Sequence, residues 1–206
     1  MPILGSFTDN PNYFWEPRGA VIKPHIFDAT LAPSGIRLEL VPTMHAATLR
    51  VTFPDNSHNQ EKRVCFREGA WSAHGSYLTG VASQVNKDGM LFDNFGLHIY
   101  AMSVGAATTE MKSRTACFKF KNSATNAEIR IATSLISQDQ AQSNLNQEMT
   151  VKVPFEELKD ETRAVWNKFL RRVDVIDPGQ GKVNGGQQLE LNKVSLYKSR
   201  LLSSNN

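Results

Sequence analysis

EIRIATSLISQDQAQSNLNQEM, residues 128–149, changes its hydrophobic period halfway along. The first half alternates apolar and polar residues, as a half-buried β-strand does. After Ile136 the apolar residues recur at intervals of four, which is typical of a helix. The stretch therefore predicts a junction at which strands give way to helices. One face of the expected strand carries Ile129, Ile131, Thr133 and Leu135.

The region upstream of the junction, from about Ile26 to Ile136, has the period of antiparallel strands. Residues 35–41 and 48–54 alternate apolar and polar side chains, which predicts two half-buried strands. A series of strands without intervening helices predicts a mainly β fold, an antiparallel β-sandwich over residues 1–136. Further strands are expected near Arg63, Ser76, Phe95, Ala116 and Glu128.

Two helices are expected after the junction, in a linker region of residues 137–186. Ser137 and Gln140 have the spacing of a capping box at the start of the first helix. Pro154 occupies the place of a first helical residue in the second, whose apolar stripe predicts that Trp166 lies in the core. The first apolar face consists of Ala141, Leu145 and Met149, and the second stripe of Phe155, Leu158, Thr162, Val165, Trp166, Phe169, Leu170 and Val173.

The end of the sequence predicts a short strand, a glycine-rich connection and a helix. Residues 173–178 predict a short strand, and the glycine-rich residues 179–186 predict a connection. Residues 189–202 predict a further amphipathic helix. Its apolar face carries Leu191, Val194, Tyr197 and Leu201.

Composition sets broad limits on partners and compartment. The chain has 206 residues, of which 40% are hydrophobic, so it can form one full domain with a buried core. Its net charge is only +3, which predicts neither a nucleic-acid nor a membrane partner. The first residues lack a basic region followed by an apolar run, and no apolar stretch is long enough to span a bilayer, so we expect no export or spanning segment. The localisation stays open.

The two cysteines, Cys65 and Cys117, leave two alternatives open. They lie far apart in the sequence, and neither belongs to a Cys-x-x-Cys motif. They could form one disulfide in a secreted protein, or be small buried hydrophobic residues in a cytosolic one.

No catalytic, cofactor-binding or metal-binding motif is apparent. Acidic residues cluster on the second expected helix, where adjacent positions do not face one another, so we interpret them as a solvated face. The five histidines lack the spacing of a zinc site. The glycine-rich connection lacks the spacing of a phosphate-binding loop. The acidic cluster is Glu156, Glu157, Asp160 and Glu161, with Asp174 and Asp177 beyond it, and the histidines are His25, His45, His58, His74 and His98.

Aromatic residues in turn-rich regions are the remaining candidates for a binding role. Trp15, beside Tyr13 and Phe14, and Trp71 could stack on the C–H face of a sugar. Burial between sheet and loop is the expected alternative for both tryptophans, because most tryptophan side chains are largely buried.

The junction and the second expected helix together resemble glycoside hydrolase family 92, the calcium-dependent exo-acting α-mannosidases. Residues 1–15, 36–54 and 93–104 resemble the N-terminal domain of that family more loosely. The positions that match the family's junction are Ala132, Ser134, Ile136, Ser137, Ala141 and Asn144, followed by Ala164, Trp166, Asn167 and Leu170.

This resemblance implies a supersandwich-like N-terminal domain, linker helices, and the start of a truncated helical (α/α)6 barrel at residues 187–206. It also implies that the full-length protein hydrolyses terminal α-mannose of N-glycan-type mannosides with inversion. The family's acid, base and Ca²⁺ belong to the barrel, so no catalytic, cofactor or metal residue is expected here, and the chain alone is not expected to be catalytic. The first barrel helix is matched at Leu196, Tyr197, Leu201 and Leu202.

Two further hypotheses remain beside this one. The chain could be a free-standing, lectin-like sandwich that binds mannose-containing glycans. It could also be a structural partner, in trans, of a separate helical barrel that packs on the linker helices.

Overall fold

A computed structural model describes residues 1–5, 13–67, 69–85, 91–149 and 153–170 of the chain. One compact unit, Met1–Trp166, contains all the described strands and the first helix. The second unit begins at Asn167, within the last turns of the second helix. The predicted strand, connection and helix beyond residue 172 lie outside the described residues.

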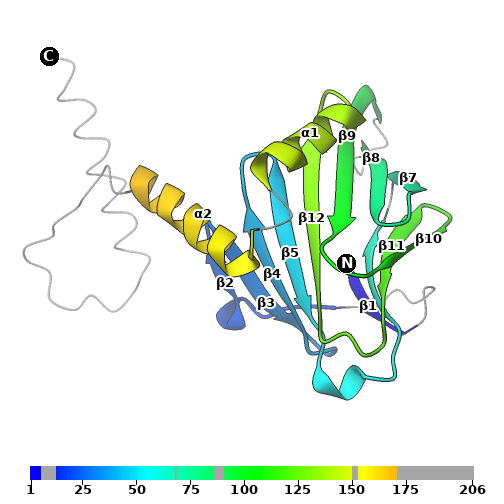
Figure 1. Ribbon diagram of the computed structural model, residues 1–206, viewed down its shortest axis with the longest axis vertical. Helices are drawn as coiled ribbons and strands as arrows, with labels where there is room; N and C mark the ends of the chain where they lie inside the picture. The colour runs from blue at the N-terminus through cyan, green and yellow to red at the C-terminus, as the bar shows by residue number, and fades with distance from the viewer. Residues whose placement is uncertain (6–12, 68, 86–90, 150–152, 171–206) are drawn as a thin grey trace, which may run out of the picture. The chain divides into compact units, whose positions relative to one another are not determined.

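Two antiparallel sheets form the fold, and the predicted mainly β sandwich followed by helices is confirmed. Figure 1 shows the large sheet with its helices, and the smaller sheet that carries the N-terminus. The four-stranded sheet has the order β1 (Pro2–Leu4), β6 (Lys62–Phe66), β11 (Thr115–Phe120) and β10 (Thr108–Lys112). The eight-stranded sheet has the order β2 (Val21–Lys23), β3 (Ile26–Leu31), β4 (Ile36–Pro42), β5 (Ala46–Thr52), β12 (Asn126–Ser134), β9 (Leu91–Ser103), β8 (Tyr77–Val85) and β7 (Gly69–Ala73). Two short 3₁₀ turns, Pro17–Gly19 and Asp55–Ser57, lie between strands.

The main hydrophobic core lies between the two sheets. Strand alternation places one apolar face of each strand there, and Ile36, Val51 and Ile129 are fully buried as that period predicts. Phe118 of β11 faces them from the smaller sheet. Leu135, predicted on the same face as Ile129, is exposed instead, because β12 ends at Ser134.

Trp71 of β7 belongs to this core and is only 9% exposed. Its ring packs against Phe66, with ring centroids 5.3 Å apart. Two glycines make room for it, since a Cβ on Gly80 would lie 2.2 Å from Trp71 Cε3 and one on Gly69 would lie 2.7 Å from Nε1. The expected burial of Trp71 is confirmed, and a sugar-stacking role for this residue is wrong.

Helices α1 (Gln138–Glu148) and α2 (Phe155–Leu170) follow β12. Ser137 caps α1 as predicted, its hydroxyl accepting from Gln140 N at 3.1 Å. The Gln140 side chain does not complete the capping box, because it donates to Asn144 Oδ1. The predicted apolar face of α1 is confirmed and packs on the face of the large sheet that points away from the small one. This second cluster contains Val41, Ala46, Tyr100, Ala132, Ala141, Leu145, Met149, Phe155 and Leu158.

The apolar stripe of α2 is buried only at its beginning. Phe155, Leu158 and Thr162 are buried, but Val165 and Trp166 are 54% and 40% exposed. The prediction that Trp166 lies in the core is therefore wrong. A helical period shows which residues share a face, but it does not show how much of that face a sheet will cover.

The contact of Trp71 with its glycines yields a stability prediction. Gly80→Ala forces a methyl group into the indole ring, and such overpacking costs about 1–3 kcal/mol of unfolding free energy. Gly19→Ala is the matched control, because nothing lies within 4 Å of its Cβ position. Urea unfolding followed by tryptophan fluorescence measures both variants. Equal stability of the two would contradict the packing described for Trp71.

Candidate functional site

Helix α2 is held on the large sheet through Arg50, which also pairs with a buried carboxylate of the sheet. The Glu39 carboxylate of β4 is part of a residue only 2% exposed. Arg50 of β5 donates to both of its oxygens, at 2.8 and 2.9 Å. Arg50 also donates to Glu156 of α2 at 2.6 Å, and its guanidinium carbon lies 3.9 Å from the centre of the Phe155 ring. Arg50 thus links two strands to the first turn of α2.

The ionic network continues across β3. Arg37 of β4 makes a two-pronged pair with Asp28, at 2.9 and 2.8 Å, and lies 3.4 Å from Glu39. The hydrogen bond from Arg37 keeps the pKa of Asp28 below its ordinary value, although burial opposes this. Likewise the hydrogen bond from Arg50 lowers the pKa of Glu156. Both carboxylates are therefore ionised partners at neutral pH.

Arg130 of β12 holds the connection between the two helices. Its side chain is 1% exposed, and its guanidinium donates to the Val153 carbonyl at 2.6 Å and lies 3.4 Å from Glu128. Val153 lies just before α2, so the start of the helix is tied to a strand in the middle of the sheet. An outward-facing arginine on this strand was not recognised as buried from the sequence, because strand alternation alone places it in solvent.

The end of α1 is fixed to the β4–β5 hairpin by Glu148. Its carboxylate accepts from Thr43 Oγ1 at 2.6 Å and from His45 N at 2.9 Å, and lies 2.6 Å from His45 Nδ1. Burial raises the pKa of Glu148, but the hydrogen bonds from His45 and Thr43 outweigh it, so that its pKa lies below the ordinary value. This contact joins residues about a hundred positions apart.

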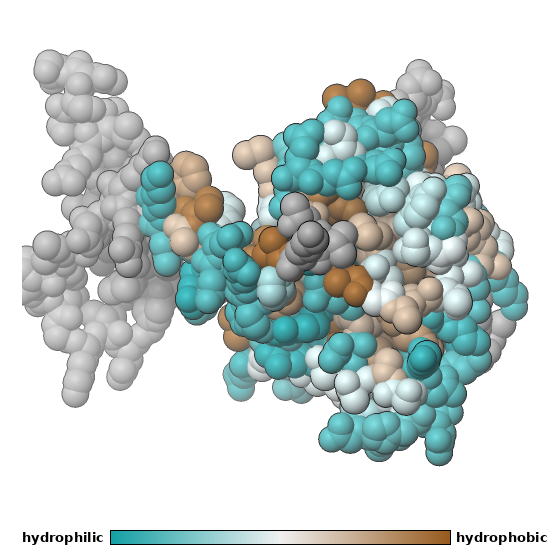
Figure 2. Space-filling model, viewed as in Figure 1, coloured by the Kyte–Doolittle hydropathy of each residue, from teal (hydrophilic) through white to brown (hydrophobic). Residues whose placement is uncertain are grey.

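Beyond these anchors α2 presents an exposed apolar surface. Val165 and Trp166 follow the last buried residue of the helix, Thr162. Figure 2 shows hydrophobic side chains on α2 among its charged ones. Large exposed apolar side chains grouped on one element are typical of interaction surfaces. The surface of Val165 and Trp166 is hereafter called the α2 apolar surface.

A second exposed group of aromatic residues lies at the β2 edge of the large sheet. Trp15 is 37% exposed and meets Phe27 edge to face, with ring centroids 5.4 Å apart. Phe14 and Ile22 are more exposed, at 58% and 64%. Ile22 is the register partner of Phe27. The structure therefore leaves Trp15, unlike Trp71, accessible to a ligand.

Among the described residues, the remaining candidates are divided between α2 and other elements, and Asp174 and Asp177 lie outside the described residues. The expected solvated face of α2 is observed, since Glu156, Glu157, Asp160 and Glu161 are all exposed. A cavity of about 340 Å³ at one end of the sandwich has Glu128 as its single carboxylate, whereas glycoside hydrolysis needs a pair. In the described ranges no three His, Cys, Asp or Glu side chains are grouped to hold a metal, and no helix there is long and apolar enough to cross a membrane.

The five histidines are dispersed over the fold. His25 lies in the β2–β3 turn and His45 in the β4–β5 hairpin. His58 follows a 3₁₀ turn, and His98 lies within β9. His74 follows β7 and stacks on Tyr77 at 4.7 Å between ring centroids.

Removal of Arg50 tests the anchor of α2. Arg50→Ala leaves Glu39 buried without its main partner, and loss of one partner of a buried pair costs about 3–5 kcal/mol, here reduced because Arg37 remains near. Arg163→Ala, which removes an exposed pair with Asp160, should cost less than about 0.5 kcal/mol. Urea unfolding followed by circular dichroism measures both. Similar losses for the two variants would contradict a special role for Arg50.

Glu148 gives the fold a dependence on acid pH. Its folded pKa is depressed, so its contribution to stability is full above the unfolded pKa and is lost as the pH falls through the folded value. Thermal unfolding between pH 7 and pH 3 should therefore show a smaller loss of Tm for Glu148→Gln than for the wild type. Glu157→Gln, at an exposed position on α2, is the control and should keep the wild-type slope. Parallel pH profiles for wild type and Glu148→Gln would contradict this role.

The fold of the chain is similar to that of solved structures. No protein-family profile and no curated protein sequence matches the chain. Among solved structures, the chain is similar to an inverting mannosidase of family GH92 from Bacteroides thetaiotaomicron VPI-5482, with a TM-score of 0.68 and 20% identity over 85% of this chain. It is also similar to the GH92 glycosyl hydrolase ccman5, with a TM-score of 0.62 and 18% identity over 80% of this chain. A GH92 α-mannosidase from Bacteroides thetaiotaomicron gives a TM-score of 0.60 at 18% identity, also over 80% of this chain.

The chain spans about a quarter of the length of these relatives, 26% in each case. At 18–20% identity the likeness concerns the fold. The resemblance to family 92 that the strand–helix junction predicts is therefore confirmed at the level of fold: this chain has a fold similar to part of the GH92 mannosidases.

Proposed function

We propose that the chain is the N-terminal sandwich module of an α-mannosidase-like glycoside hydrolase, and that the complete protein hydrolyses terminal α-mannose of N-glycan-type mannosides. The observation that carries the proposal is the fold likeness, which extends over 85% of the chain and 26% of an inverting mannosidase. The junction from strand β12 to helices α1 and α2 is part of the described fold, and the coverage of 85% supports a likeness that extends beyond the smaller sheet.

In this proposal the module itself performs no hydrolysis. An inverting glycosidase needs an acid and a base about 6.5–9.5 Å apart on opposite sides of the sugar. The cavity at the end of the sandwich offers a single carboxylate, Glu128, and the acidic residues of α2 lie on its exposed surface, where Glu156 is already paired with Arg50. The acid, the base and the Ca²⁺ site are accordingly assigned to a helical domain outside the described residues.

The role of the module in this proposal is structural. It positions the linker helices so that the helical domain can pack against them. Arg50 and Arg130 fix the beginning of α2, and Glu148 fixes the end of α1. The α2 apolar surface then supplies hydrophobic area against which a helical domain can pack. A shift of α2 on the sheet would break the Arg50–Glu156 ion pair and the hydrogen bond from Arg130 to the Val153 carbonyl, and would uncover Phe155 and Leu158.

The proposal is tested by comparing the chain with the longest open reading frame that contains it. The longer protein should release mannose from α-mannobiose with inversion, as followed by NMR of the first anomer formed, and EDTA should abolish the release. Residues 1–206 alone should release none. Ca²⁺-stimulated turnover by the purified chain, or an inactive longer protein that is well folded, would contradict the proposal.

The exposure of Trp15 favours a second candidate, a lectin-like module that binds mannose-containing glycans. Exposed indole rings are common stacking platforms, and Trp15 has Phe14 beside it. A roughly millimolar affinity, about 4 kcal/mol, is expected for one sugar on such a platform. NMR titration with α-mannobiose should shift the Trp15 indole signal, and Trp15→Ala should abolish the response while Trp166→Ala keeps it. Equal loss in both variants, or no response of the wild type, would contradict glycan binding at Trp15.

The third hypothesis, a separate helical barrel bound in trans, uses the same α2 apolar surface. Trp166→Ala distinguishes it from the lectin hypothesis, since this change should weaken capture of a barrel partner and leave glycan binding unaltered. If Trp166→Ala abolished glycan binding but left capture of the barrel partner unchanged, the α2 apolar surface would not be the site of the partner.

A further inference from the structure

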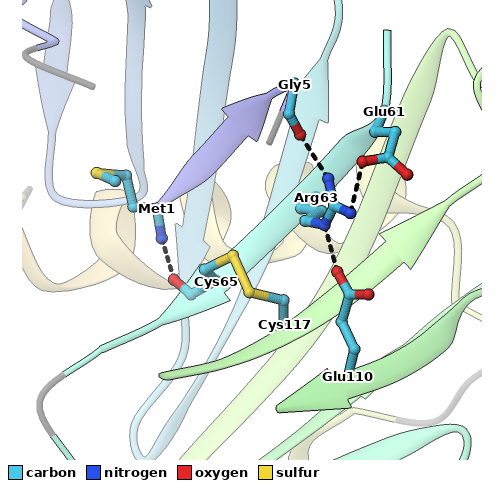
Figure 3. Close-up of a disulfide and its surroundings, with 7 residues drawn as sticks. All are labelled: Met1, Gly5, Glu61, Arg63, Cys65, Glu110 and Cys117. Carbon is cyan, nitrogen blue, oxygen red and sulfur yellow. Dashed lines mark hydrogen bonds and ion pairs between the residues drawn. A yellow bond between two sulfur atoms is a disulfide. The ribbon is translucent and has the colours of Figure 1, made fainter. Parts of the chain in front are cut away.

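The two cysteines of the chain form one disulfide between neighbouring strands of the small sheet. Cys65 of β6 and Cys117 of β11 are directly opposite in the antiparallel register, and their sulfur atoms are bonded. Residues Cys65 and Cys117 are 1% and 0% exposed. Figure 3 shows the bond beside the buried Arg63 side chain. The crosslink closes a sequence separation of 52 residues, which contains strands β7 to β10.

Strand β1 lies next to this disulfide. Ile3, the middle residue of this three-residue edge strand, is fully buried and, among the described residues, forms a hydrophobic cluster with the two cysteines. Pro2, Ile3 and Leu4 pair with β6. β1 therefore contributes the apolar side chain that packs against the disulfide.

Arg63 ties the end of β1 to the rest of the small sheet. Its guanidinium donates to the Gly5 carbonyl, just after β1, and to Glu110 of β10. It also donates to Glu61 at 2.7 Å, while Gly5 N donates to the Glu61 carbonyl at 2.9 Å. β10 is not a neighbour of β6, so Arg63 reaches across β11. These contacts hold the cover in place (Figure 3).

We propose that Cys65–Cys117 is a shielded structural crosslink that forms while the chain folds in an oxidising compartment, and that β1 is the cover that protects it afterwards. Disulfides persist in such compartments and are rare where thiols are kept reduced. Burial blocks the approach of an attacking thiolate, which must reach a sulfur atom. This inference is independent of the proposed function, since it rests on the small sheet and not on the helices.

The crosslink forms by thiol–disulfide exchange with an oxidant of the disulfide class, such as an oxidised dithiol oxidoreductase. One cysteine thiolate attacks the oxidant's disulfide and forms a mixed disulfide, and the second thiolate then displaces the oxidant. The S–S bond of the chain forms as that of the oxidant breaks. Two electrons pass to the oxidant, which leaves as a dithiol that carries the two protons.

The bond itself is tested by trapping thiols in the native host. Cells are lysed in denaturant with N-ethylmaleimide, the protein is digested, and the peptides that contain Cys65 and Cys117 are analysed by mass spectrometry. The expected result is no alkyl group on either cysteine without reductant and one on each after reduction and renewed alkylation. Alkylated Cys65 and Cys117 in the untreated protein would overturn the proposal.

The cover is tested by the rate at which dithiothreitol reduces the folded protein. Wild-type reduction should be at least about tenfold slower in buffer than in denaturing urea, because attack requires opening of β1. Ile3→Ala removes buried contacts and should speed native reduction about tenfold or more. Ile22→Ala, in the exposed edge strand β2, is the matched control and should keep the wild-type rate. Equal wild-type rates in buffer and urea would overturn the shielding role, even if Ile3→Ala failed to fold.

Discussion

The buried pair of Glu39 and Arg50 is the constraint on which the helix-covered face of the large sheet depends. A carboxylate that is almost fully buried is tolerable only when a partner and hydrogen bonds replace water, and Arg50 supplies both. The same guanidinium is then committed to Glu156 and to the Phe155 ring. Removal of α2 would therefore expose an ion pair to water and uncover apolar area at once, which couples the helix to the sandwich energetically.

That coupling explains why a strand leads directly into two helices. β12 lies between β5 and β9 in the middle of the large sheet, and α1 returns across its outer face. Arg130 then holds the connection to α2. The helices are thus parts of the sandwich's second core, in a fold that is similar to a portion of a GH92 mannosidase.

The sequence predicted those features that depend on local periodicity. The strands predicted at residues 35–41 and 48–54 and from Glu128, and the capped helix α1, follow from spacing alone, and they are confirmed as β4, β5, β12 and α1. Short edge strands such as β1 and β2 were missed, because three residues are too few to show a period. The cysteine pairing was left open, because the register that makes Cys65 and Cys117 opposite is set by partners distant in sequence.

The anchoring residues escaped sequence reasoning for a related physical reason. Glu39, Arg50 and Arg130 occupy the polar positions of alternating strands, which normally face solvent. Their burial depends on helices that arrive about a hundred residues later in the chain, or on the connection between those helices. The error at Trp166 is the converse case, in which an apolar position on a well-defined helix lies past the edge of its covered surface.

Hydrogen exchange of α2 amides is the most direct test of the claim that the linker helices are rigid parts of the sandwich. The account predicts that amides around Leu158 and Thr162 are protected to nearly the same free energy as those of β5, and that Arg50→Ala selectively lowers their protection. Fast exchange of these amides in the wild type, at the rate of an isolated helix, would mean that α2 is not held by the sheet and would contradict the account.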